Sequence, residues 1–248
     1  MTGLTMLLAL CSSAVLACAA CNSSPGRPRP DSELVSPDQI MEFNILYAQN
    51  CAGCHGTAGN GGAGNALRDP VFLAIADDSA IRNATSNGVR GTAMPAFAQS
   101  AGGMLTDKQV DALVSGIRSW ARPDDLRGAN PPPYAPKTAG NAQHGAEVYQ
   151  TFCSSCHGPN GTGGTRAGSI VDRSYLALVS DQYLRTAVIA GRPELGAPDW
   201  RENLPGRPMS DQEVNDVVAW LASRRTASPG QPYPDSKNVQ YQEHHNVD

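Results

Sequence analysis

Apolar residues recur at helical spacing in two stretches of the chain, and each stretch begins with the same capping pattern. Thr106 and Gln109 form the first capping box, in which an N-cap hydroxyl and the third helical residue bond each other's backbone N–H. Ser210 and Glu213 form the second. Beyond each box the apolar positions follow every three or four residues, which predicts two amphipathic helices with these apolar faces: Val110, Leu113, Val114, Ile117 and Trp120, then Val214, Val217, Val218 and Leu221.

Shorter helical stretches precede each of these two helices. Ser36 and Pro37 are typical of a helix start, and we expect the helix that they open to run to the cysteine at position 51. Asn141 is the expected cap of the corresponding helix in the second half, which should end at Phe152. A middle helix that ends at a glycine is predicted in each half: 77–87 before Gly88 and 181–190 before Gly191.

The composition is that of a chain rich in loops. Gly (25) and Pro (19) are abundant among the 248 residues, whereas four Phe, three Trp and seven Tyr offer little aromatic core. The formal net charge of −4 argues against nucleic-acid binding. Because residues 131–133 are consecutive prolines, residues 124–139 are predicted to be a semi-rigid linker between a first unit, 36–123, and a second unit, 140–225.

The motif C-x-x-C-H occurs once in each unit: Cys51, Cys54 and His55, then Cys153, Cys156 and His157. This is the attachment pattern of c-type haem, in which two thiols add to the porphyrin vinyl groups and the histidine binds the iron. A thioredoxin-like redox pair needs no following histidine and comes with a βαβ pattern that neither copy has. A zinc site could take four cysteines and two histidines, but each copy lies in its own helix–loop–helix repeat.

With these motifs, residues 36–225 resemble two class I cytochromes c in tandem. The resemblance implies an all-α fold, a Pro-rich linker between the domains, and two covalently attached haem c groups. It also implies that a glycine-rich loop offers a backbone carbonyl to each proximal histidine, without indicating which carbonyl. Tyr47 and Trp120 are expected contacts where the first and last helices cross. The second unit has the family's crossing glycine, Gly145, and the first unit has Phe43 in its place.

The expected distal ligand differs between the two units. Met94, followed by a proline, matches the distal-ligand loop of the family, although a methionine there can also simply pack. Aligning the glycines and capping boxes of the two units places Ala197 at the position of Met94. Met209 aligns with the residue directly before the first cap, where a hydrophobic staple explains it better. We therefore expect His55 and Met94 to bind the first iron, and His157 alone to bind the second.

The ends of the chain carry a predicted export signal and a tail. Residues 1–21 are apolar and uncharged, as in a signal peptide, and Cys18 follows a small alanine as in a bacterial lipoprotein cleavage box. Cys21 is a competing site, and simple cleavage without a lipid is the alternative. Residues 22–35 then form a polar tether, and residues 226–248 an exposed tail. The protein is expected on the periplasmic side of a bacterial membrane, lipid-anchored or otherwise secreted.

Two functions of different classes are open at this point. The first is an electron carrier between redox partners of a respiratory or photosynthetic chain, such as a quinol-oxidising complex, a terminal oxidase or a reaction centre. Such a carrier needs no bond-making residue. The alternative is a di-haem oxidoreductase, peroxidase-like or oxidising sulfur compounds, that uses an open second haem. The sixth ligand of the second haem discriminates between them, and a mainly structural role in a larger complex is a third possibility.

Overall fold

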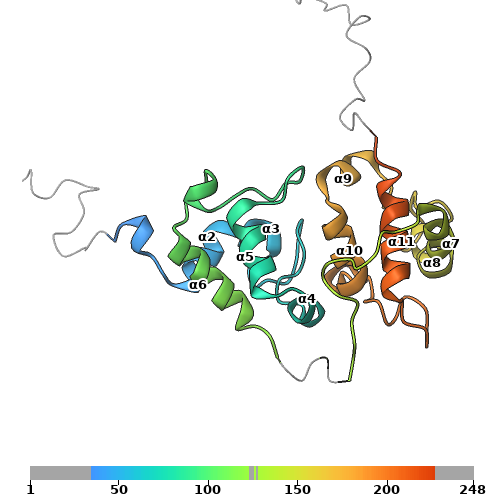
Figure 1. Cartoon of the computed structure of the whole chain (residues 1–248), viewed down its shortest axis with the longest axis horizontal. Coiled ribbons are helices and arrows are strands. Elements are labelled where there is room, and N and C mark those ends of the chain that lie inside the picture. The colour runs from blue at the N-terminus through green and yellow to red at the C-terminus, as the bar shows by residue number, and fades with distance from the viewer. Residues whose placement is uncertain (1–34, 123–125, 127, 227–248) are drawn as a thin grey trace, which may run out of the picture. The chain divides into compact units, whose positions relative to one another are not determined.

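The computed structural model describes residues 35–122, 126 and 128–226 (Figure 1). In this part of the chain every regular element is a helix, and two isolated β-bridges join Ala98 to Leu105 and Arg192 to Ala197. The predicted all-α class is therefore confirmed. Before residue 40 the structure describes residues 35–39, which include a short 3-10 turn, η2 (Pro37–Gln39). Both C-x-x-C-H motifs and all the α-helices described here lie in residues 40–248.

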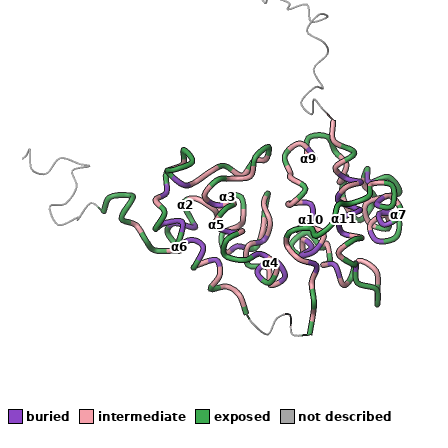
Figure 2. The backbone as a smooth tube through the Cα atoms, in the orientation of Figure 1, coloured by how far each residue is buried: buried purple, intermediate pink, exposed green. Residues whose placement is uncertain are grey.

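The first unit is built on a long last helix that packs against a short first helix and a middle helix. Buried side chains of α6 (Val110, Leu113, Ile117) meet Leu46 and Tyr47 of α2 in its core. Figure 2 shows buried residues along α6 and α4, whereas the connecting loops are mostly half-buried or exposed. The elements are α2 (Phe43–Asn50), α3 (Ala52–His55), α4 (Pro70–Ile75), α5 (Asp78–Asn87), η3 (Gln99–Ala101) and α6 (Asp107–Arg118).

The second unit repeats this order. Its last helix packs against the first and middle helices of the unit, with Tyr149, Val214 and Val217 fully buried between them. The elements are α7 (Ala142–Phe152), α8 (Ser154–His157), α9 (Arg173–Leu178), α10 (Asp181–Ala190), η4 (Pro193–Leu195) and α11 (Asp211–Ala222). The sequence analysis missed α4 and α9, which have six residues each and no room for a periodic pattern.

The predicted caps are present, with one correction at the start of the chain. Both capping boxes form, and the helices before Gly88 and Gly191 end at those glycines. The prediction that a helix runs on from Ser36 and Pro37 is wrong: η2 ends at Gln39, and α2 begins at Phe43. The buried Gln109 amide donates a hydrogen bond to the Ile40 carbonyl at 3.0 Å, which holds that carbonyl outside a helix.

The two units place large and small residues in opposite order where their first and last helices cross. In the first unit Phe43 packs on Gly116 of α6, where an added Cβ would lie 2.0 Å from the Phe43 ring. In the second unit the glycine is Gly145 of α7, where an added Cβ would lie 2.9 Å from the Trp220 Cβ. Gly116 and Trp220 occupy the same position, since each stands ten residues after its N-cap residue (116 − 106 and 220 − 210). The missing crossing glycine of the first unit is thus supplied by the opposite helix.

Each crossing is completed by a tyrosine and a tryptophan. Tyr47 and Trp120 lie edge to face with ring centroids 5.1 Å apart, as predicted. Tyr149 and Trp220 instead stack at 4.3 Å; Trp220 lies within α11, ten residues after its N-cap residue, whereas Trp120 follows the end of α6, fourteen residues after its N-cap residue. Such aromatic pairs stabilise a packed interface beyond the area that they bury.

The end of the linker is bound to the second unit. Arg185 of α10 has 2% of its surface exposed, and its guanidinium donates to the carbonyls of Pro133 at 2.7 Å and Tyr134 at 3.0 Å. It also bonds the side chains of Asn215 and Asp211. A buried guanidinium needs such partners for its N–H groups, so the segment from Pro133 onward is fixed to α10 and α11.

The exchange of large and small residues predicts a non-additive pair of substitutions. Gly116→Trp alone should destabilise the first unit by about 1–3 kcal/mol through overpacking against Phe43. Phe43→Gly alone should destabilise it by about 2 kcal/mol through lost burial. The double variant recreates the crossing of the second unit and should be more stable than the sum of the two effects allows, as measured by calorimetry of the haem-loaded protein.

A matched control is available on the same helix. Ile45 is 40% exposed. Ile45→Gly and Gly116→Trp should therefore lower the stability of the first unit by amounts that add in the double variant. If Phe43→Gly and Gly116→Trp are also additive, the two residues do not compensate each other.

Candidate haem sites

Each C-x-x-C-H motif forms a single turn of helix directly after the first helix of its unit. Cys51 is the N-cap of α3, which carries Cys54 and His55. The second motif repeats this arrangement with Cys153, Cys156 and His157 around α8. These four cysteines form no disulfide with one another. As unmodified thiols, before any attachment, Cys51 and Cys153 have raised pKa values of about 11 and about 12, because they are buried and lie beside the second thiol of the motif.

The proximal ring of the first unit is held by a loop carbonyl. His55 Nδ1 lies 2.8 Å from the carbonyl oxygen of Asn65, and because a carbonyl only accepts, Nδ1 carries the proton and Nε2 keeps its lone pair. The backbone passes close to the ring at Gly64, where an added Cβ would lie 2.6 Å from His55 Cε1. Burial lowers the pKa of His55, although the hydrogen bond to Asn65 opposes this shift. The ring is therefore neutral and oriented to bind a metal ion through Nε2.

The second unit holds its histidine in the same way. His157 Nδ1 donates to the carbonyl of Gly168 at 2.9 Å. In both units the histidine carbonyl accepts the N–H of a loop glycine at 2.9 Å, Gly61 or Gly163. The buried tyrosine of the first helix also donates to the carbonyl of the glycine that follows the histidine. Each loop therefore orients one imidazole. The carbonyls that accept from the two histidines, which the sequence did not indicate, are those of Asn65 and Gly168.

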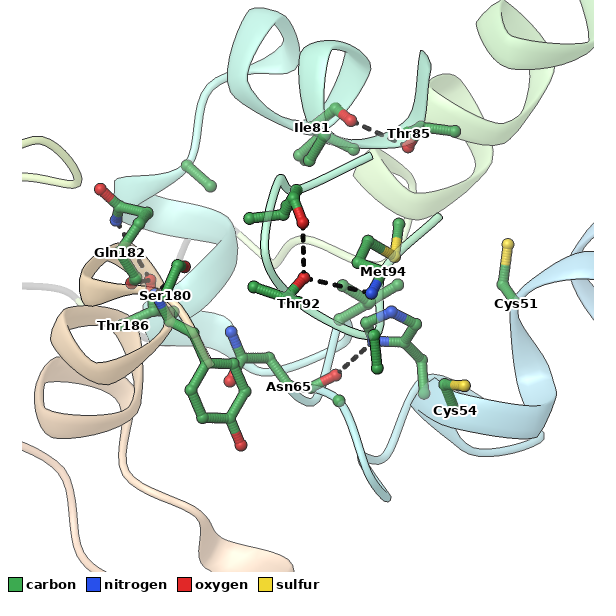
Figure 3. Close-up of a pocket in the computed structure, with 18 of the residues that line it drawn as sticks. Cys51, Cys54, Asn65, Ile81, Thr85, Thr92, Met94, Ser180, Gln182 and Thr186 are labelled. Atoms are coloured by element: carbon green, nitrogen blue, oxygen red, sulfur yellow. Dashed lines mark hydrogen bonds between the residues drawn. The ribbon is translucent and has the colours of Figure 1, made fainter. Parts of the chain in front are cut away.

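A cavity in the first unit lies against this ring, and its walls are mostly apolar. Figure 3 shows Cys51 and Cys54 on the attachment turn, Asn65 on the glycine-rich loop, and Met94 on the loop after α5. The cavity thus brings together a histidine and a methionine that the sequence predicted as partners. Its apolar lining within the unit includes Leu67, Phe72, Ala76, Ala80, Ile81, Ala84, Val89, Pro95, Phe97, Leu113 and Ile117.

Backbone hydrogen bonds fix the loop that carries Met94. The N–H of Val89 donates to the Met94 carbonyl at 3.0 Å. The Thr92 hydroxyl accepts from the Met94 N–H at 3.1 Å and donates to the Val89 carbonyl at 2.8 Å. Gly88, with φ of 66°, begins the loop, and an added Cβ there would lie 2.7 Å from the Met94 carbonyl oxygen. These contacts fix the backbone of Met94.

The residues around this cavity fit a covalently bound haem. Two thiols stand on one turn, one imidazole offers a free Nε2, and a thioether lines the same space. Asn65 lines the cavity, and its buried side-chain Oδ1 has no hydrogen-bond partner among the described residues, so it can accept a hydrogen bond from a bound group. When bound, haem supplies an iron that cycles between Fe(II) and Fe(III).

The second unit has the same distal loop without a sulfur at the matching position. The N–H of Arg192 donates to the Ala197 carbonyl at 3.0 Å, as Val89 does to Met94. Met209 is 2% exposed and directly precedes the cap of α11. The structure thus places Ala197, and not Met209, where the first unit has Met94.

Comparison with known proteins gives one family for both units. The family described as "Cytochrome C oxidase, cbb3-type, subunit III" matches residues 38–115 and 140–221. Among the described residues, none of the helices combines the length and the apolar character that a membrane crossing requires.

Relatives named as subunits of cbb3-type cytochrome c oxidases occur in several bacteria. The cbb3-type cytochrome c oxidase subunit FixP of Sinorhizobium medicae is 26% identical, over 55% of this chain and 47% of that protein. Subunit FixP of Azorhizobium caulinodans is 31% identical, over 52% of this chain and 41% of that protein. Subunit FixPc of Rhizobium leguminosarum bv. viciae is 28% identical, over 77% of this chain and 64% of that protein. The chain spans about half the length of the first curated relatives it matches.

A solved structure is also similar. The Kuenenia stuttgartiensis reducing HAO-like protein complex has 17% sequence identity with this chain, and the match covers 75% of this chain and 97% of that one. Its TM-score of 0.43 is below the level at which an overall fold is shared.

Covalent attachment can be tested motif by motif. The purified protein should retain two haems through acid–acetone extraction, because thioether bonds survive that treatment while axial ligation does not. Cys51→Ala and Cys153→Ala should each lose most of one haem, measured as haem per chain from the pyridine haemochrome spectrum. Ala52→Ser, on the same turn as Cys51, is the matched control and should keep both haems.

Proposed function

Because the chain belongs to the family of cbb3-type cytochrome c oxidase subunit III and carries two covalently attached haem c groups, we propose that it transfers electrons between redox partners of a bacterial respiratory chain. The chain has one tandem pair of class I cytochrome c domains, and electron transfer through them needs no group that makes or breaks a bond. What the protein must provide is a fixed, dry environment and two axial ligands.

The first haem site carries this proposal. His55 and Met94 line one apolar cavity; a loop carbonyl holds the His55 ring, and hydrogen bonds hold the backbone of Met94. Methionine and histidine ligation raises the potential of a haem iron, and burial limits the reorganisation that accompanies electron transfer. A rigid, pre-formed site with two strong ligands is suited to a carrier, since it leaves no position for a substrate.

The redox partner is proposed from the relatives. They are named as subunits of cbb3-type cytochrome c oxidases, which are terminal oxidases. We therefore rank a terminal oxidase first among the partners, ahead of a quinol-oxidising complex or a photosynthetic reaction centre. If the chain is a stable subunit of such an oxidase, it should co-purify with it from the membrane. If it is a separate carrier, it should purify alone and reduce the oxidase when the two are mixed.

Substitution of the methionine tests the carrier site directly. Met94→Ala should lower the potential of one haem and open its iron to carbon monoxide, because the thioether that stabilises Fe(II) is lost. The measurement is an optical redox titration with and without carbon monoxide. Met104 is 80% exposed, and Met104→Ala is the matched control that should change neither haem. An unchanged spectrum and potential in Met94→Ala would remove Met94 as a ligand.

One observation favours the alternative function, a di-haem oxidoreductase. Ala197 occupies the position of Met94 in the second unit, so the second iron has a displaceable or open distal side in this proposal. An enzyme of this class would also need acid–base or anion-binding groups beside that iron. Turnover with hydrogen peroxide or a sulfur compound that disappears in His157→Ala, and survives in Met94→Ala, would favour it.

Export and lipid anchoring are part of the proposal. Cys18 and Cys21 lie outside the described residues, and their roles rest on the cleavage pattern alone. We place the two haem domains on the periplasmic side of the membrane, held by a lipid on Cys18. Cys18→Ser should then release the protein from the membrane fraction or leave it unprocessed. Mass spectrometry of a mature wild-type N-terminus without a lipid would contradict the anchor and support simple secretion.

A further inference from the structure

The distal loops of the two units have the same length, and their backbones match where each loop returns past the glycine that begins it. An added Cβ at Gly88 would lie 2.7 Å from the Met94 carbonyl oxygen and 2.6 Å from the Pro95 carbonyl carbon. At Gly191 the corresponding distances, to Ala197 and Pro198, are also 2.7 and 2.6 Å. With the 3.0 Å hydrogen bond at the start of each loop, this sets Ala197 at the place of Met94 in three dimensions.

Ala197 has no atom that can bind iron, and its loop offers no substitute. Residues 192–200 contain no histidine, methionine, cysteine or lysine. The two carboxylates of the loop are already paired: Glu194 accepts from Arg192, and Asp199 accepts from Arg201 Nη2 at 2.6 Å. The loop therefore keeps its shape while its ligating side chain is missing.

Met209, the single methionine in residues 140–225, is held elsewhere. Its N–H donates to the Trp200 carbonyl at 2.9 Å, just as Leu105 donates to Phe97 at 2.8 Å in the first unit. Its side chain is 2% exposed, and the Asn203 amide lies 3.8 Å from its sulfur. Met209 is thus the structural counterpart of the packed Leu105 and not of Met94.

A tyrosine on the middle helix is also engaged. Tyr183 stands eight residues before Gly191, as the cavity-lining Ala80 stands eight before Gly88 (191 − 183 and 88 − 80). Its hydroxyl accepts from Arg192 Nη1 at 2.5 Å, and burial raises its pKa. The phenol therefore stays neutral, in which form it is a poor iron ligand.

We propose that, of the residues the structure describes, His157 alone binds the second haem iron, and that its distal side is a binding site for a small diatomic π-acceptor ligand when the iron is reduced. This inference rests on the proposed haem sites and adds to them a difference between the two haems. The first haem is closed by Met94 and passes electrons, whereas the second admits an external ligand of the class of carbon monoxide and nitric oxide.

The test is the number of carbon monoxide molecules bound per chain by the reduced, haem-loaded protein, followed optically. We expect one for the wild type, two for Met94→Ala and none for Ala197→Met, in which a thioether is restored on an unchanged backbone. The oxidised wild type should show one high-spin and one low-spin haem in electron paramagnetic resonance. Ala197→Met should convert the high-spin signal to low-spin and add a second sulfur-to-iron charge-transfer band.

Two variants act as controls. Met209→Leu, which copies Leu105, and Tyr183→Phe should both leave the count at one. A wild type that binds no carbon monoxide overturns the proposal. If Met209→Leu then binds one carbon monoxide per chain, the Met209 sulfur is the distal ligand. If removal of His244 and His245 has that effect, a histidine of the C-terminal tail is the distal ligand.

The failure of the proposed function gives a different result. If the wild type binds two molecules, Met94 is not a ligand of the first haem. The inference about the second haem then still holds if Ala197→Met lowers the count to one, and is overturned if the count stays at two. Wild type and Met94→Ala decide the question by themselves if Ala197→Met fails to load its haem.

Discussion

Each haem unit depends on one hydrogen bond, from a histidine Nδ1–H to a backbone carbonyl of the glycine-rich loop. The bond fixes the tautomer and the plane of the ring, so Nε2 faces the space for the iron. It also constrains the loop, because a carbonyl can reach the ring only if the backbone passes beside it. Gly64 meets this requirement in the first unit, since any side chain there would overlap the imidazole.

The rest of each unit supports that loop from one side. Tyr47 and Tyr149 donate to the carbonyl of the glycine directly after each histidine. Tyr47 packs against Trp120, just after the end of α6, and Tyr149 packs against Trp220 of α11. The helix crossing is therefore connected to the proximal ligand through a single aromatic residue. This explains why the crossing can exchange Phe43 and Gly116 for Gly145 and Trp220 while the tyrosine position stays the same: the total volume at the crossing matters, and the helix that supplies it does not.

The sequence predicted the elements whose cause is local. Capping boxes, terminal glycines and the spacing within C-x-x-C-H all involve residues a few positions apart, and the structure has each of them. Contacts between distant residues could not be predicted. The break before α2 depends on Gln109, and the compensation for Phe43 depends on Gly116. The proximal carbonyl lies ten residues after His55 but eleven after His157, so no fixed spacing could have identified it.

The distal loops show why a matching backbone does not imply a matching ligand. Hydrogen bonds between backbone groups, a glycine with positive φ and a proline set the path of both loops, and none of these requires a methionine. A change from methionine to alanine therefore removes the sulfur without removing the loop. Conversely, a ligand cannot be inferred from the shape of such a loop; it must be inferred from the side chain at one position. In a chain with two copies of the unit, that single side chain is enough to give the two haem irons different chemistry within the same fold.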